Sequence, residues 1–485
     1  MFVAFTLQTS FYSIFVRMKS SFGNINPTLF AKRVLSLAIG LIMIVSCRDK
    51  NDDNGTNRDD FERYNLTDKT IYKILDSCYL WNESLPEFSN NEARKPDEFF
   101  KSLLSSVDKW SFIRDDYDKL NKELEGEPFT MGYSPQFFNY KGKVMMVVEY
   151  VYRDSPAEKA GLRRGDIVSK IDGEEMTTDN YGKLYAKQKA TYTIGIYNAE
   201  TGLFDDARQI TLEAAAIEAD PSVYDTIIDV NGKAVGYYVF TKFAYNQKYN
   251  EHINSIFDSF REAGVKDLIV DLRYNGGGIT WVAQLLASNT APAAVVEGEE
   301  VMSRLVFNDN LTKVRNKNPE NFLYRFFDSG HNADMENVYF LCSRGTASAS
   351  EMLITALMPY MNVKIIGTNT RGKYVGMFVF DRTVPGYTGL GNWAILPIMF
   401  KIANAEGYTD FDGGLQPNYY VEDDMMSGYQ FGDLNDPMLA MAIDVIGGQP
   451  LTAKAARQNP FIVIGRDESV SNNNLIINIQ NKISE

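Results

Sequence analysis

The feature that constrains the fold most is a strand–turn–helix–strand pattern between residues 338 and 373. Residues 338–342 are Val-Tyr-Phe-Leu-Cys, an apolar run that is typical of a buried strand. A Gly-Thr pair then indicates a tight turn, and apolar side chains at helical spacing follow it. Residues 363–366 form a second apolar run, which leads into a polar loop ending at Lys373. The pattern places Ser348 where a buried strand turns into a helix.

Ser348 at this position could serve as a nucleophile. Backbone N–H groups at the start of a helix lack intrahelical acceptors, and the helix dipole is positive there, so an oxyanion could be held. A serine hydroxyl needs a base, and Lys373 could be that base if desolvation lowered its pKa. A structural interpretation stays open, because Ser348 and Glu351 also have the spacing of a helix capping box. Lys373 could equally be a solvated loop charge.

A second strand–helix pattern precedes this stretch. Residues 233–240 and 267–273 have the composition of buried strands, and residues 249–264 between them have the periodicity of an amphipathic helix. The glycine run 276–278 and a further helix, 280–287, follow the second strand. This order indicates a layered α/β domain. The glycine run lacks both the spacing of a dinucleotide-binding loop and the Lys-Ser/Thr pair of a P-loop.

Length and composition limit the number of domains and argue against several classes of function. A chain of 485 residues has room for about two to four domains. Its net charge of −14 and the lack of a basic stripe argue against a nucleic-acid partner. The two histidines, His252 and His331, lie in a helical stretch and a polar loop, so a Ser-His-Asp triad is not indicated. The three cysteines form no CxxC motif, and we expect no metal and no organic cofactor.

The N-terminus has the pattern of an export signal. A basic pair at residues 32–33 precedes thirteen mostly apolar residues, 34–46, which are too few to span a bilayer and suit a signal-peptide core. The run ends at Cys47 in a sequence that resembles a bacterial lipobox, in which the cysteine is lipidated. An ordinary signal peptide with an incidental cysteine is the alternative, and translation starting at Met18 is another open point. Residues 47–65 are polar and predict a flexible tether.

Residues 66–127 are predicted to form an N-terminal helical domain. Apolar side chains recur at helical spacing in two runs, and an acidic pair at residues 97–98 suits the start of the second helix. Trp81 and Trp110 are interpreted as core anchors rather than ligand contacts.

Residues 155–162 are Ser-Pro-Ala-Glu-Lys-Ala-Gly-Leu, and Gly-Asp-Ile-Val follows at 165–168. On these motifs, residues 128–200 resemble the PDZ domains of bacterial proteases. PDZ domains bind a peptide C-terminus as an added strand, with its carboxylate on backbone N–H groups. The predicted carboxylate-binding loop consists of Thr130, Met131, Gly132 and Tyr133. A PDZ domain that only packs on the core and regulates it is the alternative.

Residues 345–351 are Gly-Thr-Ala-Ser-Ala-Ser-Glu, and a Gly-Lys pair follows later in the chain. On these motifs rests a resemblance, from about residue 66 to residue 447, to the C-terminal processing peptidases, also called tail-specific proteases. It implies that Ser348 is the nucleophile and Lys373 its general base. It also implies a peptidase core of the ClpP/crotonase-like type, so the expected fold class is α/β and multi-domain.

The resemblance also implies an oxyanion hole. The sequence Asp-Leu-Arg-x-Asn-x-Gly-Gly at 271–278 matches the family motif whose second glycine supplies one N–H, here Gly278. The N–H of Ala349 would be the second donor. One departure is Met377, which stands where the family often has a glutamine that orients the lysine. A thioether cannot fill that role well, so a Ser–Lys dyad is expected rather than a triad.

The leading hypothesis is a serine endopeptidase that cleaves polypeptides near their C-termini or in unfolded segments captured by the PDZ domain. The alternative is a catalytically silent, PDZ-type peptide-binding lipoprotein. Lipidation of Cys47 would anchor the protein to the outer membrane of a Gram-negative cell envelope, on its periplasmic or outer face, as in Bacteroides-type lipoproteins. The predicted divisions are a signal peptide at 1–46, a tether at 47–65, a helical domain at 66–127, a PDZ-like domain at 128–200, a peptidase core at 201–447 and a tail at 448–485. An apolar run at 461–464 could add an edge strand to a sheet, and a mobile tail is the alternative.

Overall fold

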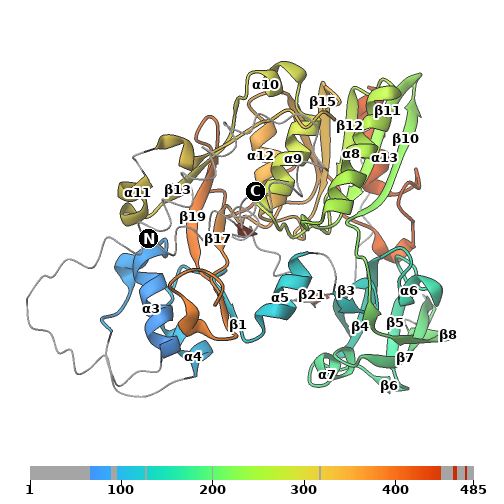
Figure 1. Ribbon diagram of the computed structural model, residues 1–485. Coiled ribbons are helices and arrows are strands. Elements are labelled where there is room, and N and C mark those ends of the chain that lie inside the picture. The colour runs from blue at the N-terminus through green and yellow to red at the C-terminus, as the bar shows by residue number, and fades with distance from the viewer. Residues whose placement is uncertain are drawn as a thin grey trace, which may run out of the picture. The chain divides into compact units, whose positions relative to one another are not determined.

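The computed structural model describes most of the chain after the predicted tether. The described residues are 66–88, 95–125, 128–198, 200–201, 203–315, 318–448, 462–466 and 476–477. The predicted signal peptide, Cys47 and the tether lie outside the described residues. No helix in the described ranges is long and apolar enough to cross a membrane. The predicted fold class, a multi-domain α/β protein with an N-terminal helical segment and a PDZ-like domain, is confirmed (Figure 1).

The N-terminal segment is mainly helical, as its periodicity predicts. Its elements are α3 Leu66–Cys78, η2 Asn82–Ser84, α4 Pro96–Leu103, β1 Phe112–Arg114 and α5 Tyr117–Leu124. Helix α3 buries Ile71, Ile74 and Leu75, which recur at helical spacing. Strand β1 pairs antiparallel with β18, Ala394–Leu396, and thereby ties this segment to a distant part of the chain.

The PDZ-like segment is built on one sheet of order β21-β3-β4-β5-β7-β8. Its elements are β2 Phe129–Thr130, β3 Tyr133–Tyr140, β4 Lys143–Val151, α6 Pro156–Lys159, β5 Ile167–Ile171, β6 Glu174–Glu175, α7 Tyr181–Tyr185, β7 Lys189–Asn198, β8 Leu203–Glu213 and β9 Ala215–Ala216, with β21 Ile462–Arg466 from the tail. The short helix α6 begins as the motif predicts, with the Ser155 side chain accepting from the Glu158 N–H. Strand β8 pairs with β7 along its length, so this hairpin crosses the boundary predicted at residue 200.

The core contains a six-stranded sheet of order β10-β11-β12-β15-β16-β20, in which β11 to β20 run parallel. Its strands are β10 Ser222–Val230, β11 Lys233–Phe240, β12 Asp267–Asp271, β15 Asn337–Cys342, β16 Asn362–Gly367 and β20 Tyr419–Tyr420. Helix α13, Pro437–Gly447, packs on one face through Met438 and Leu439. Helix α8, Gln247–Glu262, packs on the other face, where Phe257 contacts Tyr238. The helices α9, Thr280–Thr290, and α12, Ala349–Leu357, contact each other beside α8 (Figure 1).

A second core sheet of order β14-β13-β19-β17-β22 lies next to α12. Its strands are β14 Leu323–Arg325, β13 Val301–Phe307, β19 Ile398–Asn404, β17 Val375–Phe378 and β22 Ile476–Ile477. Connecting elements are α10 Ala293–Glu297, α11 Asp309–Arg315, η3 Pro319–Phe322, η4 Thr388–Leu390 and η5 Met425–Ser427. The edge strand predicted in the tail is present as β21, slightly further along the chain than the predicted run.

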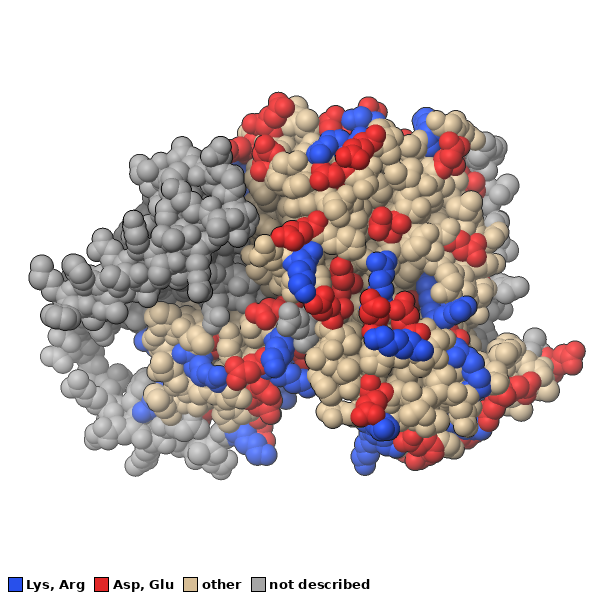
Figure 2. All heavy atoms as spheres, turned by 45° about the vertical axis from the view of Figure 1, so that its right-hand side comes forward, with Lys and Arg blue, Asp and Glu red and all other residues tan. Residues whose placement is uncertain are grey.

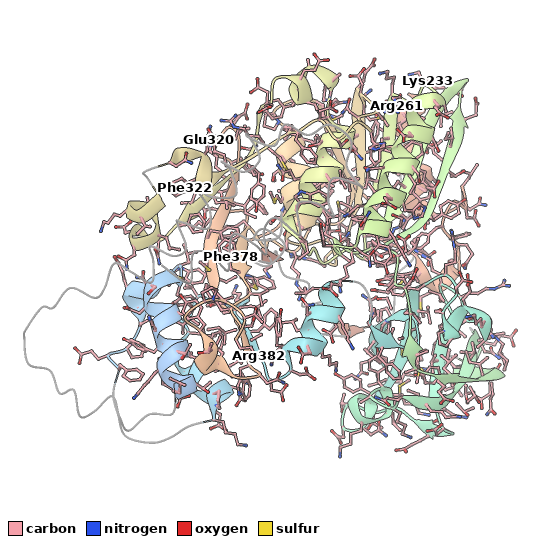
Figure 3. The ribbon with its side chains drawn as sticks, viewed as in Figure 1. Lys233, Arg261, Glu320, Phe322, Phe378 and Arg382 are labelled. Atoms are coloured by element: carbon pink, nitrogen blue, oxygen red, sulfur yellow. The ribbon has the colours of Figure 1, made fainter. Side chains whose placement is uncertain are left out.

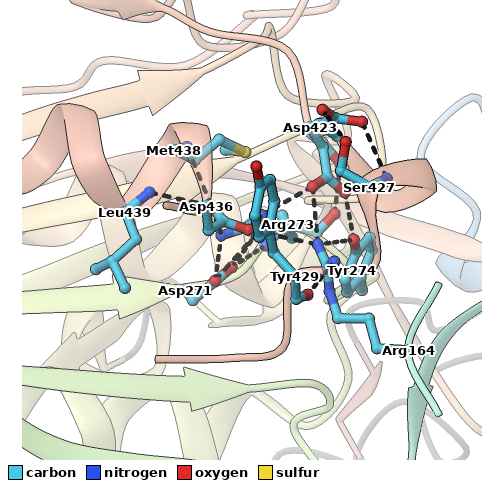
Figure 4. A network of polar contacts seen from close by, with 12 residues as sticks. Arg164, Asp271, Arg273, Tyr274, Asp423, Ser427, Tyr429, Asp436, Met438 and Leu439 are labelled. Atoms are coloured by element: carbon cyan, nitrogen blue, oxygen red, sulfur yellow. Dashed lines mark hydrogen bonds and ion pairs between the residues drawn. The ribbon is translucent and has the colours of Figure 1, made fainter. Parts of the chain in front are cut away.

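A buried cluster of charges joins the PDZ-like segment to the core (Figure 4). The Arg273 guanidinium lies between three aspartates, 2.8 Å from Asp271 Oδ2, 2.8 Å from Asp423 Oδ1 and 2.9 Å from Asp436 Oδ2. Arg164, from the turn before β5, donates to Asp423 Oδ1 at 2.9 Å and to the Tyr274 hydroxyl at 2.9 Å. A buried charge is tolerated only when it is paired and hydrogen-bonded, which this cluster achieves.

One face of the molecule carries a mixture of charges rather than a nucleic-acid footprint. Figure 2 shows acidic and basic side chains intermixed over the described residues on that face, without a continuous basic stripe. This mixture of charges is in keeping with the net charge of −14.

Candidate active site

Ser348 lies at the N-cap of α12, directly after the turn that leaves β15. Its φ of 64° is in the left-handed region, which is rare for a residue with a side chain and is found at functional turns. The turn is held to the glycine loop after β12, because the Ala347 N–H donates to Asn275 O at 3.0 Å. The Thr346 hydroxyl also donates to Leu272 O at 2.7 Å. The strained residue is therefore held in place through the turn that precedes it.

The Ser348 hydroxyl and the Lys373 amine are both buried and have no hydrogen-bond partner among the described residues. Their residues are 1% and 2% exposed. Leaving a polar atom in this condition costs free energy, and native proteins rarely do so without a functional reason. Other buried polar atoms, such as Asn250 Oδ1 and Ser303 Oγ, share this condition, but Ser348 and Lys373 combine it with the residue types of a nucleophile and a base.

The Glu351 carboxylate brings the two residues together. Its Oε2 accepts from the Ser348 N–H at 2.8 Å and from the Lys373 N–H at 2.8 Å. The backbone nitrogens of Ser348 and Lys373 are therefore no further apart than the sum of these two hydrogen-bond distances. Its Oε1 accepts from the Gly372 N–H at 2.7 Å and from the Thr370 hydroxyl at 2.5 Å. Glu351 caps α12, as the sequence predicts, and it also binds the loop that carries the lysine.

Replacing Glu351 by glutamine is expected to loosen this arrangement. The amide would present N–H groups to backbone N–H groups that now donate to a carboxylate, and a buried donor without an acceptor costs about 1–3 kcal/mol. We expect a matching loss in the free energy of unfolding, measured by urea denaturation. The exposed Glu262→Gln should change stability by less than about 0.5 kcal/mol. Equal stability of the two variants would show that Glu351 does not hold the site together.

Lys373 lies beneath a side chain that comes from the N-terminal segment. Its Nζ is 5.0 Å from the centre of the Trp110 ring, and the Arg371 guanidinium lies 5.5 Å from the same ring. Burial lowers the pKa of Lys373 well below its ordinary value, and the Arg371 charge lowers it further, while Asp108 and Glu351 oppose this shift. A depressed pKa makes the neutral amine available as a base at moderate pH.

The sequence favours Trp110 as a core anchor, and the structure instead places it over Lys373. Its loop is held by Asp108, whose Oδ1 accepts from the Trp110 N–H at 2.8 Å and from the Ser111 N–H at 2.9 Å. Nothing in the local sequence distinguishes a tryptophan that covers a lysine from one that fills a core. The contact joins residues far apart in the chain, and only the fold reveals it.

The glycine loop approaches the serine closely, as an oxyanion hole would require. A Cβ on Gly277 would lie 2.7 Å from Ser348 Cβ and 2.9 Å from the Ala349 nitrogen. Gly278 has a φ of 141°, and a Cβ there would lie 2.4 Å from Phe243 O. The Gly277 N–H is already used by Asn275 Oδ1 at 2.9 Å. Within the described ranges, the N–H groups of Gly278 and Ala349 donate to no backbone acceptor, as the predicted oxyanion hole requires.

Three further residues that the sequence singles out, Met377, His252 and His331, supply no base or metal ligand to this site. Met377 is fully buried in β17 and offers no strong hydrogen-bond acceptor to the lysine. His252 and His331 belong to two separate pairs, with Asp220 and Asp258. No cluster of three or more His, Cys, Asp or Glu side chains that could hold a metal occurs in the part of the chain that the structure describes.

The predicted carboxylate-binding loop lies at the start of β3. Met131 and Tyr133 point into the core of the PDZ-like sheet, where the Tyr133 hydroxyl donates to the Tyr192 hydroxyl at 3.0 Å. The Gly132 N–H donates to Thr130 Oγ1 at 3.3 Å. A Cβ on Gly132 would lie 2.2 Å from Ser155 Cβ, so only glycine fits. The side chains of Met131 and Tyr133 are therefore not available to a ligand, which is in keeping with the backbone recognition predicted for this loop.

Comparison with protein families gives three matches along the chain. The model of peptidase family S41 matches residues 234–421, the PDZ domain model matches residues 147–186, and the model of the S41 N-terminal domain matches residues 67–112. The crystal structure of a Bacteroides fragilis protein described as an S41 protease aligns with a TM-score of 0.65 and 26% identity. It covers 78% of this chain and 97% of that one. The chain carries a domain of peptidase family S41.

Curated relatives are more distant in sequence than this structural neighbour. A CtpA-like serine protease of Staphylococcus haemolyticus is 24% identical, with 62% of this chain and 55% of the relative covered. A carboxyl-terminal-processing protease of Synechocystis is also 24% identical, with 61% and 63% covered. The chain therefore spans less than two thirds of the length of these relatives. The S41 model and the N-terminal model together include Trp110, the glycine loop, Ser348 and Lys373.

Proposed function

We propose that this protein is a serine endopeptidase that uses a Ser348–Lys373 dyad. The observation that carries the proposal is the pair of buried, unsatisfied groups, the Ser348 hydroxyl and the Lys373 amine, in residues fixed to a single oxygen of Glu351. The lowered pKa of the lysine, caused first by burial, supports its role as the base.

The reaction would proceed in two halves. Ser348 Oγ attacks the peptide carbonyl carbon while Lys373 takes its proton, and the N–H groups of Gly278 and Ala349 stabilise the oxyanion. The lysine then gives that proton to the leaving amine, the C–N bond breaks and an acyl-enzyme remains. A water molecule, deprotonated by Lys373, attacks the ester and releases the new carboxylate. Proton return to Ser348 restores the dyad.

The substrates would be polypeptides held as extended strands. Relatives named carboxyl-terminal-processing proteases and the PDZ match favour segments near a C-terminus or unfolded segments that the PDZ-like sheet captures. The signal-like N-terminus and Cys47 favour a lipid-anchored protein of the outer membrane in a Gram-negative cell envelope.

The second candidate is a catalytically silent peptide-binding lipoprotein, which the presence of Met377 at the usual glutamine position favours. Without an orienting acceptor the amine could be buried but unproductive.

An acylating serine probe separates the two functions. We expect labelling at Ser348, located by mass spectrometry, and no labelling in Lys373→Ala. Because the neutral amine is the base, the labelling rate should rise with pH and level off well below the ordinary lysine pKa of 10.5. Absence of label at Ser348 in the folded chain at every pH would favour the binding protein. Labelling that persists in Lys373→Ala would remove the lysine from the mechanism.

A further inference from the structure

The tail of the chain occupies an edge of the PDZ-like sheet. Strand β21 pairs antiparallel with β3, with Ile462 opposite Asn139 and Arg466 opposite Gln136. Strand β3 has β4 as its other neighbour, so β21 takes the edge that would otherwise be open. An open strand edge offers unpaired N–H and C=O groups, which bind any extended segment.

This edge is where a PDZ ligand is expected to bind. The predicted carboxylate-binding loop comes directly before β3, and helix α7 packs beside the strand, where Phe137 lies 5.1 Å from Tyr181 and 5.3 Å from Tyr185 between ring centres. A PDZ peptide pairs as an added strand between such a strand and helix. In its antiparallel pairing, β21 runs towards the loop, as an incoming peptide would.

A second piece of the tail pairs beside the candidate active site. Strand β22 pairs parallel with β17, with Ile476 opposite Met377 and Ile477 opposite Phe378. Strand β17 begins at the second residue after Lys373, and Figure 3 labels Phe378 at its end. Strand β22 also contacts α9, which begins two residues after Gly278. Strand β22 therefore contacts both β17, which follows the proposed base, and α9, which follows the proposed oxyanion hole.

We propose that residues 462–466 are a built-in ligand of this peptidase, which competes with polypeptide substrates for the β3 edge, while residues 476–477 hold the tail at β17. The proposal rests on the proposed function. The strands are only five and two residues long and are held by backbone pairing, which another extended peptide can replace. A tethered ligand acts at an effective concentration on the order of millimolar, so it can exclude a weak ligand without binding tightly itself.

The test uses the full chain with proline in β21. Val463→Pro together with Ile464→Pro removes two backbone donors and disfavours strand pairing. The exchange Val463→Ile with Ile464→Val keeps the composition and both N–H groups, and serves as the matched control. In the Ser348→Ala background, binding of a fluorescent Phe-Ile-Val-Ile-Gly-Arg-Asp peptide is followed by anisotropy. If the tail occupies the edge for about nine tenths of the time, the proline variant should bind about tenfold more tightly, and the control should be unchanged.

Cleavage of an unfolded protein by the same tail variants with Ser348 intact completes the test, and the proline variant should be the faster enzyme. Tighter peptide binding without cleavage in any variant would support the tail proposal and defeat the proposed function. If the parent chain cleaves the substrate and the proline variant shows the same peptide affinity and the same cleavage rate, the tail proposal is overturned and the proposed function stands. A lower melting temperature without tighter peptide binding would identify β21 as a permanent structural strand, which also overturns it.

Discussion

Ser348→Ala and Lys373→Met are each expected to lower kcat/KM for an unfolded protein substrate by about a thousandfold or more, because nucleophile and base act as one unit. The double variant should be little worse than either single variant, since the remaining member has no partner to activate. The residual rate would come from the Gly278 and Ala349 N–H groups and from substrate binding.

The melting temperature of Lys373→Met shows whether this variant is folded. Lys373 is fully buried with an unpaired amine, so replacing that amine by a thioether of similar length should leave the melting temperature unchanged or raise it. The matched control is Lys233→Met, at the exposed start of β11 (Figure 3), which should keep full activity. Activity in Ser348→Ala, or a Lys373→Met variant that is folded and active, would contradict the dyad.

The sequence predicts the elements around the site well because each is a local pattern. The strand before Ser348, the helix after it and the glycine loop after β12 follow from short apolar runs and turn residues. Their meeting at one edge follows from parallel strand order, with β12 next to β15. Local patterns do not give that strand order, and it is the family resemblance that assigns Ser348 and Gly278 to one site.

What the sequence could not supply are contacts between segments far apart in the chain. Glu351 has the spacing of a helix cap, and its second role, binding the backbone at residues 370–373, depends on how that loop returns to α12. Trp110 reaches Lys373 because β1 pairs with β18. The apolar run in the tail predicts only an edge strand, with no indication that it would join the sheet at β3.

Arg273→Met is expected to cost about 3–5 kcal/mol in the free energy of unfolding, because it leaves buried aspartates without their central cation. The guanidinium is 1% exposed and donates to Asp271, Asp423 and Asp436. Arg164→Met should cost less, since Asp423 keeps Arg273 as a partner. Arg261→Met removes an exposed pair with Asp258 and should cost less than about 1 kcal/mol, so it is the control.

The pH dependence of the stability lost in Arg273→Met shows whether charge or packing causes the loss. In the parent protein, Asp423 is buried, which alone would raise its pKa, but Arg164 and Arg273 bring that pKa below its ordinary value. Its contribution to stability is therefore present above the unfolded pKa of about 4 and is lost as the pH falls further. Without Arg273, protonation relieves the buried Asp423 carboxylate, so urea denaturation should show the difference in unfolding free energy between parent and variant shrinking from pH 7 towards pH 4. A difference that stays constant with pH would mean that Arg273 stabilises by packing rather than by charge.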